Sequence, residues 1–377
     1  MSSSVPGRPS ACGEVAVVGA GVTGLLVAHE LRRLGVDSVT VYERSGIAAG
    51  ASGVQPGGIR QQWGTAVNCL LARESLAFYR EARERLEMRV DPRFQACGYL
   101  FLAHSPETRA RLAANVALQN ELGVPSRIVE PDEAAWLVPA LDPSSLAGAS
   151  WCAEDGYLDR PQAVLETLGE RATVVRAEVV GLTAERSGWE LALADGTSAT
   201  AASVLVAAGW ESRALVPELP IEREARYLFL SEPIRERLLE PLVISPERHF
   251  AAKQLADGRV LASDLTAAGD PGRERDGWQR HVRECVETLL PALEFVSLSL
   301  LVKGLYDVTP DHQAILGEVR PDLWVAAGFS GHGFMLAPAV GRIIAEAMAL
   351  GREDEALRLL DARRFAEGRL LPEPQVV

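Results

Sequence analysis

The chain has 377 residues, of which 47% are hydrophobic and 24% charged, and its formal net charge is 38 − 51 = −13. This composition is that of a folded globular protein, and the length favours two domains or one interleaved pair. The excess of acidic residues repels phosphate backbones, and the basic residues near 80–89 and 273–283 alternate with Glu and Asp. No nucleic-acid partner is therefore expected.

The cysteines and the N-terminal segment argue against several other classes. The five cysteines are scattered, without a CxxC pair or zinc-ligand spacing, so neither a disulfide framework nor a metal site is predicted. Residues 1–13 are small and polar and lack the apolar core of a secretory signal, so we expect a disordered N-terminus and a cytoplasmic protein. No uninterrupted apolar run reaches the roughly 18 residues of a spanning helix, so no stable membrane insertion is expected.

Residues 14–43 predict a βαβ unit. A short apolar strand is followed by the glycine-rich turn 19–24, a helix, and a second strand that ends at Glu43. The glycines permit a tight turn and close approach of the backbone to a pyrophosphate at the helix N-terminus, while an acidic residue after the second strand suits a ribose hydroxyl. This order predicts a dinucleotide site, and by itself it leaves NAD and FAD equally open.

The rest of the chain alternates between helices and strands, which indicates that a second domain is inserted into the first. Helices are predicted over 66–89, 106–122, 131–137, 161–171 and 273–290, and strands over 96–103, 173–176 and 201–207.

The last α/β segment favours a flavin. A strand over 323–327 leads into the glycine-rich loop 328–334 and a helix over 338–350. Exposed amides at a helix N-terminus stabilise negative charge, which a reduced flavin carries on its pyrimidine edge and for which NAD has no equivalent.

Three stretches resemble the D-amino acid oxidase, glycine oxidase and sarcosine oxidase family of FAD-dependent enzymes. They are residues 15–24 with Glu43, the segment 50–62 containing GASG and GGIRQQ, and residues 302–311 (VKGLYDVTPD) with 327–335. Within the family, these motifs are most similar to those of the branch of sarcosine oxidase β-subunits and L-proline dehydrogenase β-subunits. The resemblance implies FAD and the oxidation of an amine.

The resemblance also implies site residues. Arg60 would lie over the flavin and bind the substrate carboxylate, because its planar guanidinium suits a bidentate contact. A tyrosine such as Tyr227 would assist it. Arg60, His332 and Met335 are the candidate catalytic residues, His332 for proton transfer. The implied cofactor contacts are Gly19, Gly21, Val22, Thr23, Gly24, Glu43, Arg44, Ser52, Gly53, Gly57, Gly58, Val179, Gly209, Gly331, His332, Gly333, Phe334 and Met335.

Departures from the family pattern qualify this picture. Gly304 stands where monomeric sarcosine oxidases carry the cysteine that tethers FAD, and Pro161 stands near the histidine that holds a second flavin in heterotetrameric enzymes. FAD is therefore expected to be non-covalent. Met335 replaces a second carboxylate ligand, and Lys253 is only an approximate match to an oxygen-activating lysine. Oxygen and another electron acceptor both stay open.

The expected fold is α/β, with a Rossmann-type FAD-binding domain and an interleaved α+β substrate domain built on an antiparallel sheet. The expected activity is hydride transfer from a small amino acid or N-methyl amine to flavin N5, which leaves an imine. Alternatives are a flavin-binding β-type subunit that acts only in a hetero-oligomer, and an NAD-dependent dehydrogenase; a homo-oligomer is equally open. The FAD-binding domain is predicted at 14–88, 150–215 and 305–377, and the substrate domain at 89–149 and 216–304.

Overall fold

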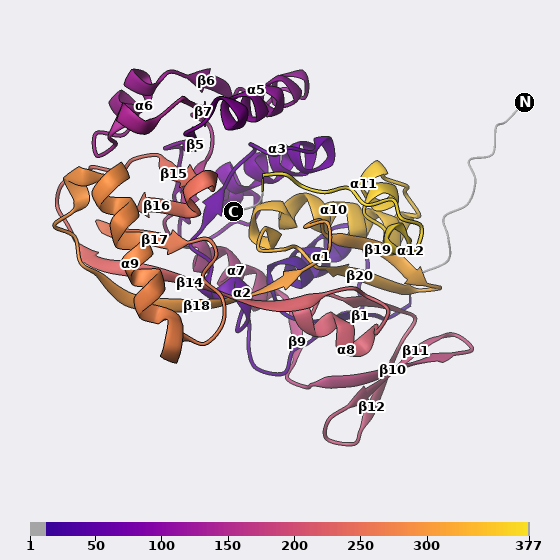
Figure 1. Cartoon of the computed structure of the whole chain (residues 1–377). Helices are drawn as coiled ribbons and strands as arrows, with labels where there is room; N and C mark the ends of the chain where they lie inside the picture. The colour runs from indigo at the N-terminus through magenta and orange to yellow at the C-terminus, as the bar shows by residue number, and fades with distance from the viewer. Residues whose placement is uncertain (1–12, 376–377) are drawn as a thin grey trace, which may run out of the picture.

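The computed structural model describes residues 13–375. Apart from Gly13, the predicted disordered segment 1–13 lies outside the described residues. Within them the chain builds two large sheets, which lie side by side in Figure 1 with the helices α1 and α10 beside the first and α9 beside the second. The predicted α/β fold with a second, mainly antiparallel sheet is confirmed.

The first sheet is the predicted nucleotide-binding sheet. Its strand order is β19-β20-β13-β1-β2-β9, and all neighbours are parallel except β19 and β20. Every residue of β1 is buried because both faces of the sheet are covered. The strands are β1 (Val15–Val18), β2 (Val39–Tyr42), β9 (Thr173–Val175), β13 (Ser203–Val206), β19 (Ile315–Arg320) and β20 (Leu323–Ala327).

One face of this sheet is covered by helices and the other by a small antiparallel sheet. Val17 belongs to the helix-side core, whereas Val18 belongs to a core that includes Trp189 and Leu191 of the small sheet. That sheet projects at the bottom of Figure 1. The helices are α1 (Val22–Arg33), α3 (Ala66–Arg80), α7 (Pro161–Arg171) and α10 (Gly333–Leu350), and the strands are β10 (Val179–Glu185), β11 (Gly188–Leu193) and β12 (Ser198–Ala201).

Helix α10 is the most apolar helix of the chain for a packing reason. By length and hydropathy it could span a membrane, but most of it is buried in the protein, where it contacts α1 and α3. A Cβ at Gly341 would lie 2.9 Å from Cβ of Leu26, so glycine permits the close approach of α10 to α1.

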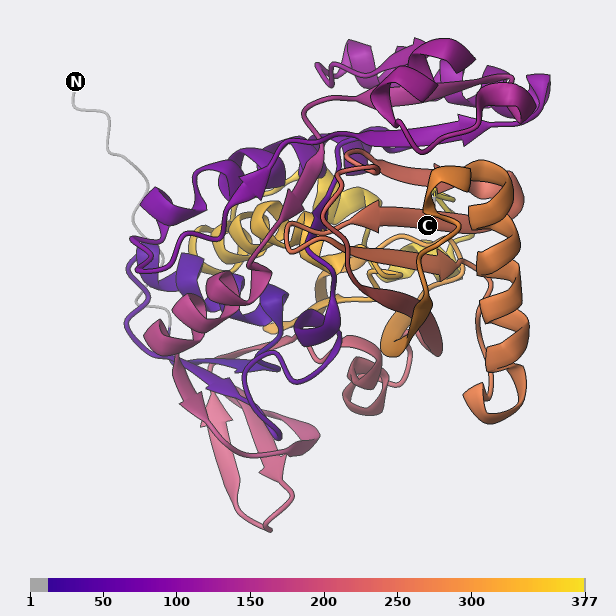
Figure 2. The same cartoon turned by 90° about the vertical axis from the view of Figure 1, so that its left-hand side faces the viewer.

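The second large sheet is mainly antiparallel and forms most of the predicted substrate half. Its order is β18-β14-β17-β16-β15-β5-β7-β6, and the neighbours are antiparallel except β15 and β5. Helix α9 stands along one face (Figure 2), where Trp278 stacks on Tyr227 with 4.5 Å between ring centroids. The bounds are β5 (Tyr99–Ala103), β6 (Arg127–Val129), β7 (Gly148–Cys152), β14 (Glu222–Pro233), β15 (Leu242–Ser245), β16 (Phe250–Gln254), β17 (Arg259–Asp264), β18 (Leu298–Val308) and α9 (Pro271–Leu289).

Short elements connect the two sheets. The predicted domain boundaries after residues 149 and 304 fall inside β7 and β18, and the division into domains stays a prediction. A second small sheet pairs β8 with both β3 and β4. The remaining elements are α2 (Ala51–Val54), β3 (Gly58–Ile59), α4 (Ala82–Arg85), β4 (Phe94–Gln95), α5 (Pro106–Glu121), α6 (Pro131–Leu137), β8 (Gly156–Leu158), α8 (Ser212–Leu215), α11 (Glu355–Leu359) and α12 (Arg363–Ala366).

Candidate cofactor and substrate site

A cavity of about 1130 Å³ runs from the first sheet to the second. Its nucleotide end is formed by the turn after β1, the end of β2 and the segment around Gly209. Its strand end is formed by β14, β17 and β18 together with the loop before α10. A single continuous space therefore joins the predicted dinucleotide motif to the sheet of the substrate half.

Backbone geometry shapes the nucleotide end. Gly19 has φ +108°, and a Cβ there would lie 2.5 Å from the carbonyl oxygen of Ala207. A Cβ at Gly24 would lie 2.1 Å from the carbonyl oxygen of Gly19. The Ser52 hydroxyl accepts a hydrogen bond from the amide of Val22 (3.0 Å) in the first turn of α1. The result is a narrow turn at the N-terminus of a 12-residue helix, which is a favourable place for an anion.

Glu43 lies at the carboxyl end of β2 and lines the cavity. Its carboxylate accepts hydrogen bonds from the amides of Ala20 (3.0 Å) and Ser45 (2.7 Å), so the acid holds both loops that enclose it. Arg44 pairs with Glu178 and Glu211 at the rim. The cavity thus receives an acidic group at this end, as an unphosphorylated ribose requires.

The loop Gly328–Phe334 meets β18 at the strand end. Gly331 has φ +90°, and a Cβ there would lie 2.2 Å from the ring of Tyr306. The Asp307 carboxylate accepts a hydrogen bond from the amide of Gly328 (2.7 Å). These two contacts fix the loop so that Gly331, Gly333 and Phe334 line the cavity at the start of α10.

Arg60 is placed differently from the sequence prediction. It is 1% exposed, does not line the cavity, and donates to the carbonyl oxygens of Gln62 and, at 2.7 Å, Gln375. Its guanidinium carbon lies 3.7 Å from the ring centroid of Trp63. Desolvation by burial lowers the pKa of Arg60, and the buried Glu373 opposes that shift. The geometry commits Arg60 to the protein interior, so the carboxylate role has no support here.

His332 and Met335 are also absent from the cavity wall. His332 is 3% exposed, its ring meets Trp63 edge-on at 4.5 Å, and its Nε2 is buried without a hydrogen-bond partner among the described residues. Burial holds the pKa of His332 well below its usual range, and the nearby Arg60 adds to that shift. Met335 packs beside the helix-side core, near Gly58. The proton-transfer role of His332 stays a prediction.

The cavity wall contains about two thirds of the predicted cofactor residues. Three of the others are glycines that the packing of the backbone requires, because a Cβ at Gly24, Gly53 or Gly57 would lie within 2.5 Å of a backbone oxygen. The predicted residues in the wall are Gly19, Gly21, Val22, Thr23, Glu43, Arg44, Ser52, Val179, Gly209, Gly331, Gly333 and Phe334, and those outside it are Gly24, Gly53, Gly57, Gly58, His332 and Met335.

Two further candidates belong to the protein framework: Tyr227, weighed as a substrate ligand, and Lys253, weighed as the oxygen-activating lysine. Tyr227 stacks on α9 and donates to the carbonyl oxygen of Gly269 (3.0 Å), so it is not available to a substrate carboxylate. Lys253 is buried, donates to the carbonyl oxygen of Pro56 (2.6 Å) and lies 4.2 Å from the ring centroid of Tyr157. Burial lowers the pKa of Lys253 to about 8.

Sequence reasoning missed most of the strand end. The missed wall residues stand on β14, β17 and β18, where the alternation of side chains along a strand was the available signal. The alternation shows which residues share one face of a strand, but which face lines the cavity is known only once the pairing of the strands is known. The missed residues include Arg226, Leu228, Ser263, Tyr306 and Asp307.

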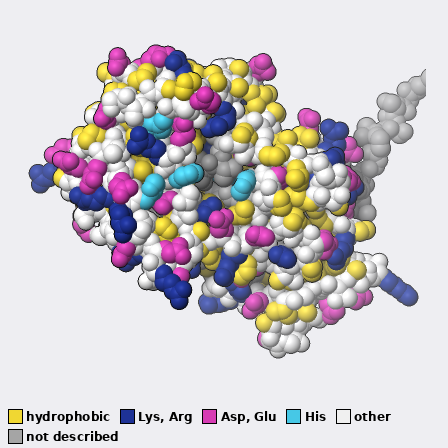
Figure 3. Space-filling view, viewed as in Figure 1, with side chains coloured by type: hydrophobic (Ala, Val, Ile, Leu, Met, Phe, Trp, Pro, Cys, Tyr) yellow, Lys and Arg dark blue, Asp and Glu magenta, His cyan; other side chains and the backbone are white. Residues whose placement is uncertain are grey.

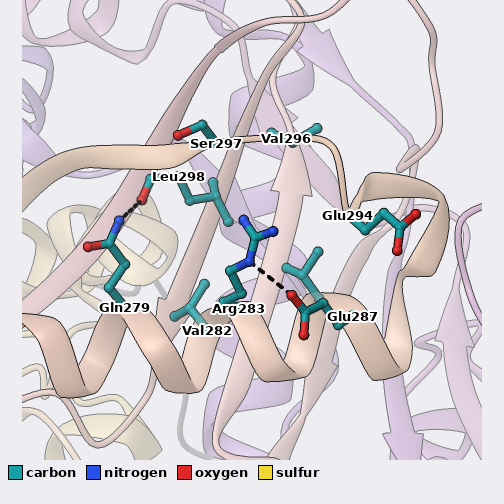
Figure 4. Close-up of a pocket in the computed structure, with 9 residues that line it drawn as sticks. Gln279, Val282, Arg283, Glu287, Glu294, Val296, Ser297 and Leu298 are labelled. Carbon is teal, nitrogen blue, oxygen red and sulfur yellow. Dashed lines mark hydrogen bonds and ion pairs between the residues drawn. The ribbon is translucent and has the colours of Figure 1, made fainter.

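A second hollow on the surface is much smaller. It measures about 50 Å³ and lies between α9 and residues 294–298 (Figure 4). Gln279 donates to the carbonyl oxygen of Leu298 (2.9 Å), and Arg283 pairs with Glu287 (2.9 Å). On the face seen in Figure 3, acidic and basic side chains are mixed over the surface. We therefore place the candidate site in the large cavity.

A βαβ unit of the dinucleotide-binding type, joined by one cavity to a second sheet, defines a nucleotide-cofactor oxidoreductase. Comparison with known proteins makes this specific: the chain belongs to the FAD dependent oxidoreductase family, whose model matches residues 14–347. It is an FAD-dependent enzyme, and the resemblance stated from the sequence is confirmed. The glycine turn, Glu43 and the length of the cavity fit FAD.

The chain is similar to several named relatives over most of its length. It is 30% identical over 402 residues to FAD-dependent oxidoreductase domain-containing protein 1 of Bos taurus, covering 90% of this chain and 81% of that protein. It is 27% identical to sarcosine oxidase subunit beta of Rhodobacter capsulatus, covering 96% and 90%. The crystal structure of L-proline dehydrogenase from P. horikoshii matches with a TM-score of 0.87 and 28% identity, covering 96% and 99%.

Proposed function

We propose that this enzyme oxidises the C–N bond of a small amino acid or N-methyl amine. The observation that carries the proposal is the continuous cavity, which lets a dinucleotide bound after β1 extend to the loop Gly331–Phe334 and to Tyr306. When bound, FAD supplies the hydride acceptor. The similarity to a sarcosine oxidase subunit and to an L-proline dehydrogenase supports an amine as the donor.

The chain's own groups would bind and orient. The amide of Gly21 and the N-terminal end of α1 would hold the pyrophosphate, and Glu43 would hold the ribose. The first amides of α10, an 18-residue helix beginning at Gly333, would stabilise negative charge on the cofactor ring. Tyr306 would close the strand end against water and align the reacting C–H bond.

The test is anaerobic reduction followed at about 450 nm, where flavins in general absorb. The purified holoenzyme would be mixed with sarcosine, L-proline, D-proline and glycine, and with amines that lack the carboxylate. We expect at least one amino acid or N-methyl amine to bleach the flavin after mixing. If none does, while dithionite bleaches the flavin fully, the proposed reaction class is wrong.

We propose that FAD is held without a covalent bond. Supporting this, no cysteine or histidine of residues 13–375 lines the cavity, and Gly304 stands in its wall. Precipitation with acid should release all of the flavin into the supernatant. Yellow colour retained in the washed pellet would contradict the proposal.

A second candidate function is a β-type subunit that is active only with other chains. It is favoured by the 27% identity to sarcosine oxidase subunit beta over 96% of this chain. Gel filtration of the chain expressed alone, with turnover measured against oxygen and against a dye acceptor, separates the two. Turnover by the isolated chain would argue for independent action. The acceptor itself and the cytoplasmic location remain predictions.

A further inference from the structure

We propose that Arg226 is the side chain that binds the substrate carboxylate. The inference rests on the proposed function, because it presumes an amino-acid substrate at the strand end. Arg226 stands on β14 and lines the cavity. Its guanidinium carbon lies 5.9 Å from the ring centroid of Tyr306, the residue that packs against the loop before α10.

The register of two strands aims Arg226 at the cofactor side of the sheet. In the antiparallel pair β14 and β18, Arg226 lies opposite Gly304, and Glu224 lies opposite Tyr306. Directly opposed residues share a face, and alternate residues of a strand share it too. The face that carries Tyr306 meets Gly331 of the loop, so Arg226 is on the face toward the cofactor.

The opposite face of the same strands packs beneath α9, although Tyr227 and Lys303 on it also line the cavity. Tyr227 and Phe229 belong to the core beneath α9, and Tyr227 stacks on Trp278. Lys303, opposite Tyr227, lies on this face by the same alternation. Of the two cations Arg226 and Lys303, Arg226 is therefore the one on the face that carries Tyr306.

The other arginines of the cavity wall serve the nucleotide end. Arg44 pairs with Glu178 and Glu211, and Arg223 lies 5.0 Å from the ring centroid of Trp210, next to Gly209. Arg213 donates to a backbone carbonyl beside the same segment. None of these contacts lies at Tyr306, where the amino acid would meet the cofactor ring.

Arg226 has both room and free donors. Gly304, across from it, has no side chain, and the closest atom to a Cβ built there is Val54 Cγ2 at 3.7 Å. One terminal nitrogen of Arg226 pairs with Glu224 at 2.6 Å. Among the described residues no hydrogen bond engages its other terminal nitrogen or Nε, which together form an edge suited to a carboxylate.

Glu224 gives the proposal a second, opposite test. It neutralises Arg226 in the free protein and competes with an incoming carboxylate for the same guanidinium. The two side chains are only partly exposed (28% and 33%), so their interaction is incompletely screened by water. Removing the charge of Glu224 should therefore strengthen carboxylate binding.

The first experiment uses matched substrates. Rates of anaerobic flavin reduction would be measured for L-proline against pyrrolidine and for sarcosine against dimethylamine, in the wild type and in Arg226→Gln. We expect the variant to lose about 30- to 100-fold in kcat/KM for the amino acid and under threefold for the amine. Glu224→Gln should lower the KM for the amino acid about threefold. Arg259→Gln, at the exposed start of β17, is the charge-matched control and should change neither rate.

The second experiment has a readout other than turnover. Benzoate would be titrated into the oxidised holoenzyme, and the shift of the flavin absorbance band would give its dissociation constant. Arg226→Gln should weaken benzoate binding by about 30-fold with flavin content unchanged. Equal binding by wild type and variant, or the same loss in Lys303→Gln instead, would overturn the proposal. Loss of flavin in Arg226→Gln, with Arg226→Lys failing to restore it, would assign Arg226 to the cofactor and also overturn it.

The two failures are distinguishable. If no amino acid or amine reduces the wild-type flavin, the proposed function fails. If they do reduce it and Arg226→Gln keeps the wild-type preference for the carboxylated member of each pair, the assignment of Arg226 fails alone.

Discussion

The two ends of the cavity are built in different ways. The nucleotide end contains one contiguous stretch, from β1 through α1 to Glu43, joined by the segments around Val179 and Gly209, and its shape depends on backbone geometry such as the φ of +108° at Gly19. The strand end is formed by side chains of β14, β17 and β18, which are far apart in sequence. A site shaped by the backbone is visible as a motif, whereas one assembled by strand register is not.

The largest effect should follow a change at the nucleotide end. Gly19→Val places a branched side chain 2.5 Å from the carbonyl oxygen of Ala207 at a positive φ, so the turn has to move. We expect flavin content, measured as the ratio of absorbance at 450 and 280 nm after incubation with FAD, to fall at least tenfold. Gly35→Ala is the matched control, since Gly35 has φ +89° but nothing within 4 Å of a Cβ. Full flavin in Gly19→Val would break the comparison.

The next effect tests whether the substrate site extends to Arg60. Because Arg60 is buried and hydrogen-bonded to backbone, Arg60→Met should lower the free energy of unfolding by about 2–4 kcal/mol. The value of kcat/KM should fall by the same factor for an amino acid and for its matched amine. Denaturant unfolding and steady-state kinetics measure the two quantities. A selective loss for the amino acid would return the carboxylate role to Arg60.

A pH-dependent effect is expected from Asp155, beside Arg60. Burial raises the pKa of Asp155 to about 6, opposed by hydrogen bonds from Gln61 and Gln62. Because this pKa exceeds the ordinary value near 4, the stabilising contribution is present below about pH 4 and is lost as the pH rises toward 6. Between pH 4 and 7 the free energy of unfolding of the wild type should therefore decrease, relative to that of Asp155→Asn, by up to about 3 kcal/mol. Parallel curves for both proteins would contradict the assignment.

The smallest effect is expected outside both ends. Arg283 and Glu287 form an exposed pair on α9 (58% and 47% exposed), and such pairs contribute little. Arg283→Ala should change the unfolding free energy by less than about 0.5 kcal/mol and leave flavin content and turnover unchanged. A marked loss of turnover would move functional importance to the hollow on α9.

Much of the fold followed from local patterns. The strand over 14–18, the helix after the glycines and the helix over 161–171 form close to their predicted bounds, because burial and helix-start signals act over a few residues. The predicted helix over 66–89 instead breaks after Arg80, and a shorter helix, α4, follows. The pairing of β18 with β14, which are some 70 residues apart, leaves no local trace.

By itself the sequence determined the cofactor class, because a dinucleotide site needs glycines at positions that only the backbone can use, and those positions are contiguous. The tertiary structure decided which cations line the cavity. Arg60 follows the glycine pair of a recognisable motif, yet the protein interior surrounds it and its donors are engaged by backbone carbonyls. Arg226 lies in no motif, and only the register of β14 on β18 turns it toward Tyr306. Side-chain direction on a sheet depends on which strands pair and in which register, and distant segments settle both through packing.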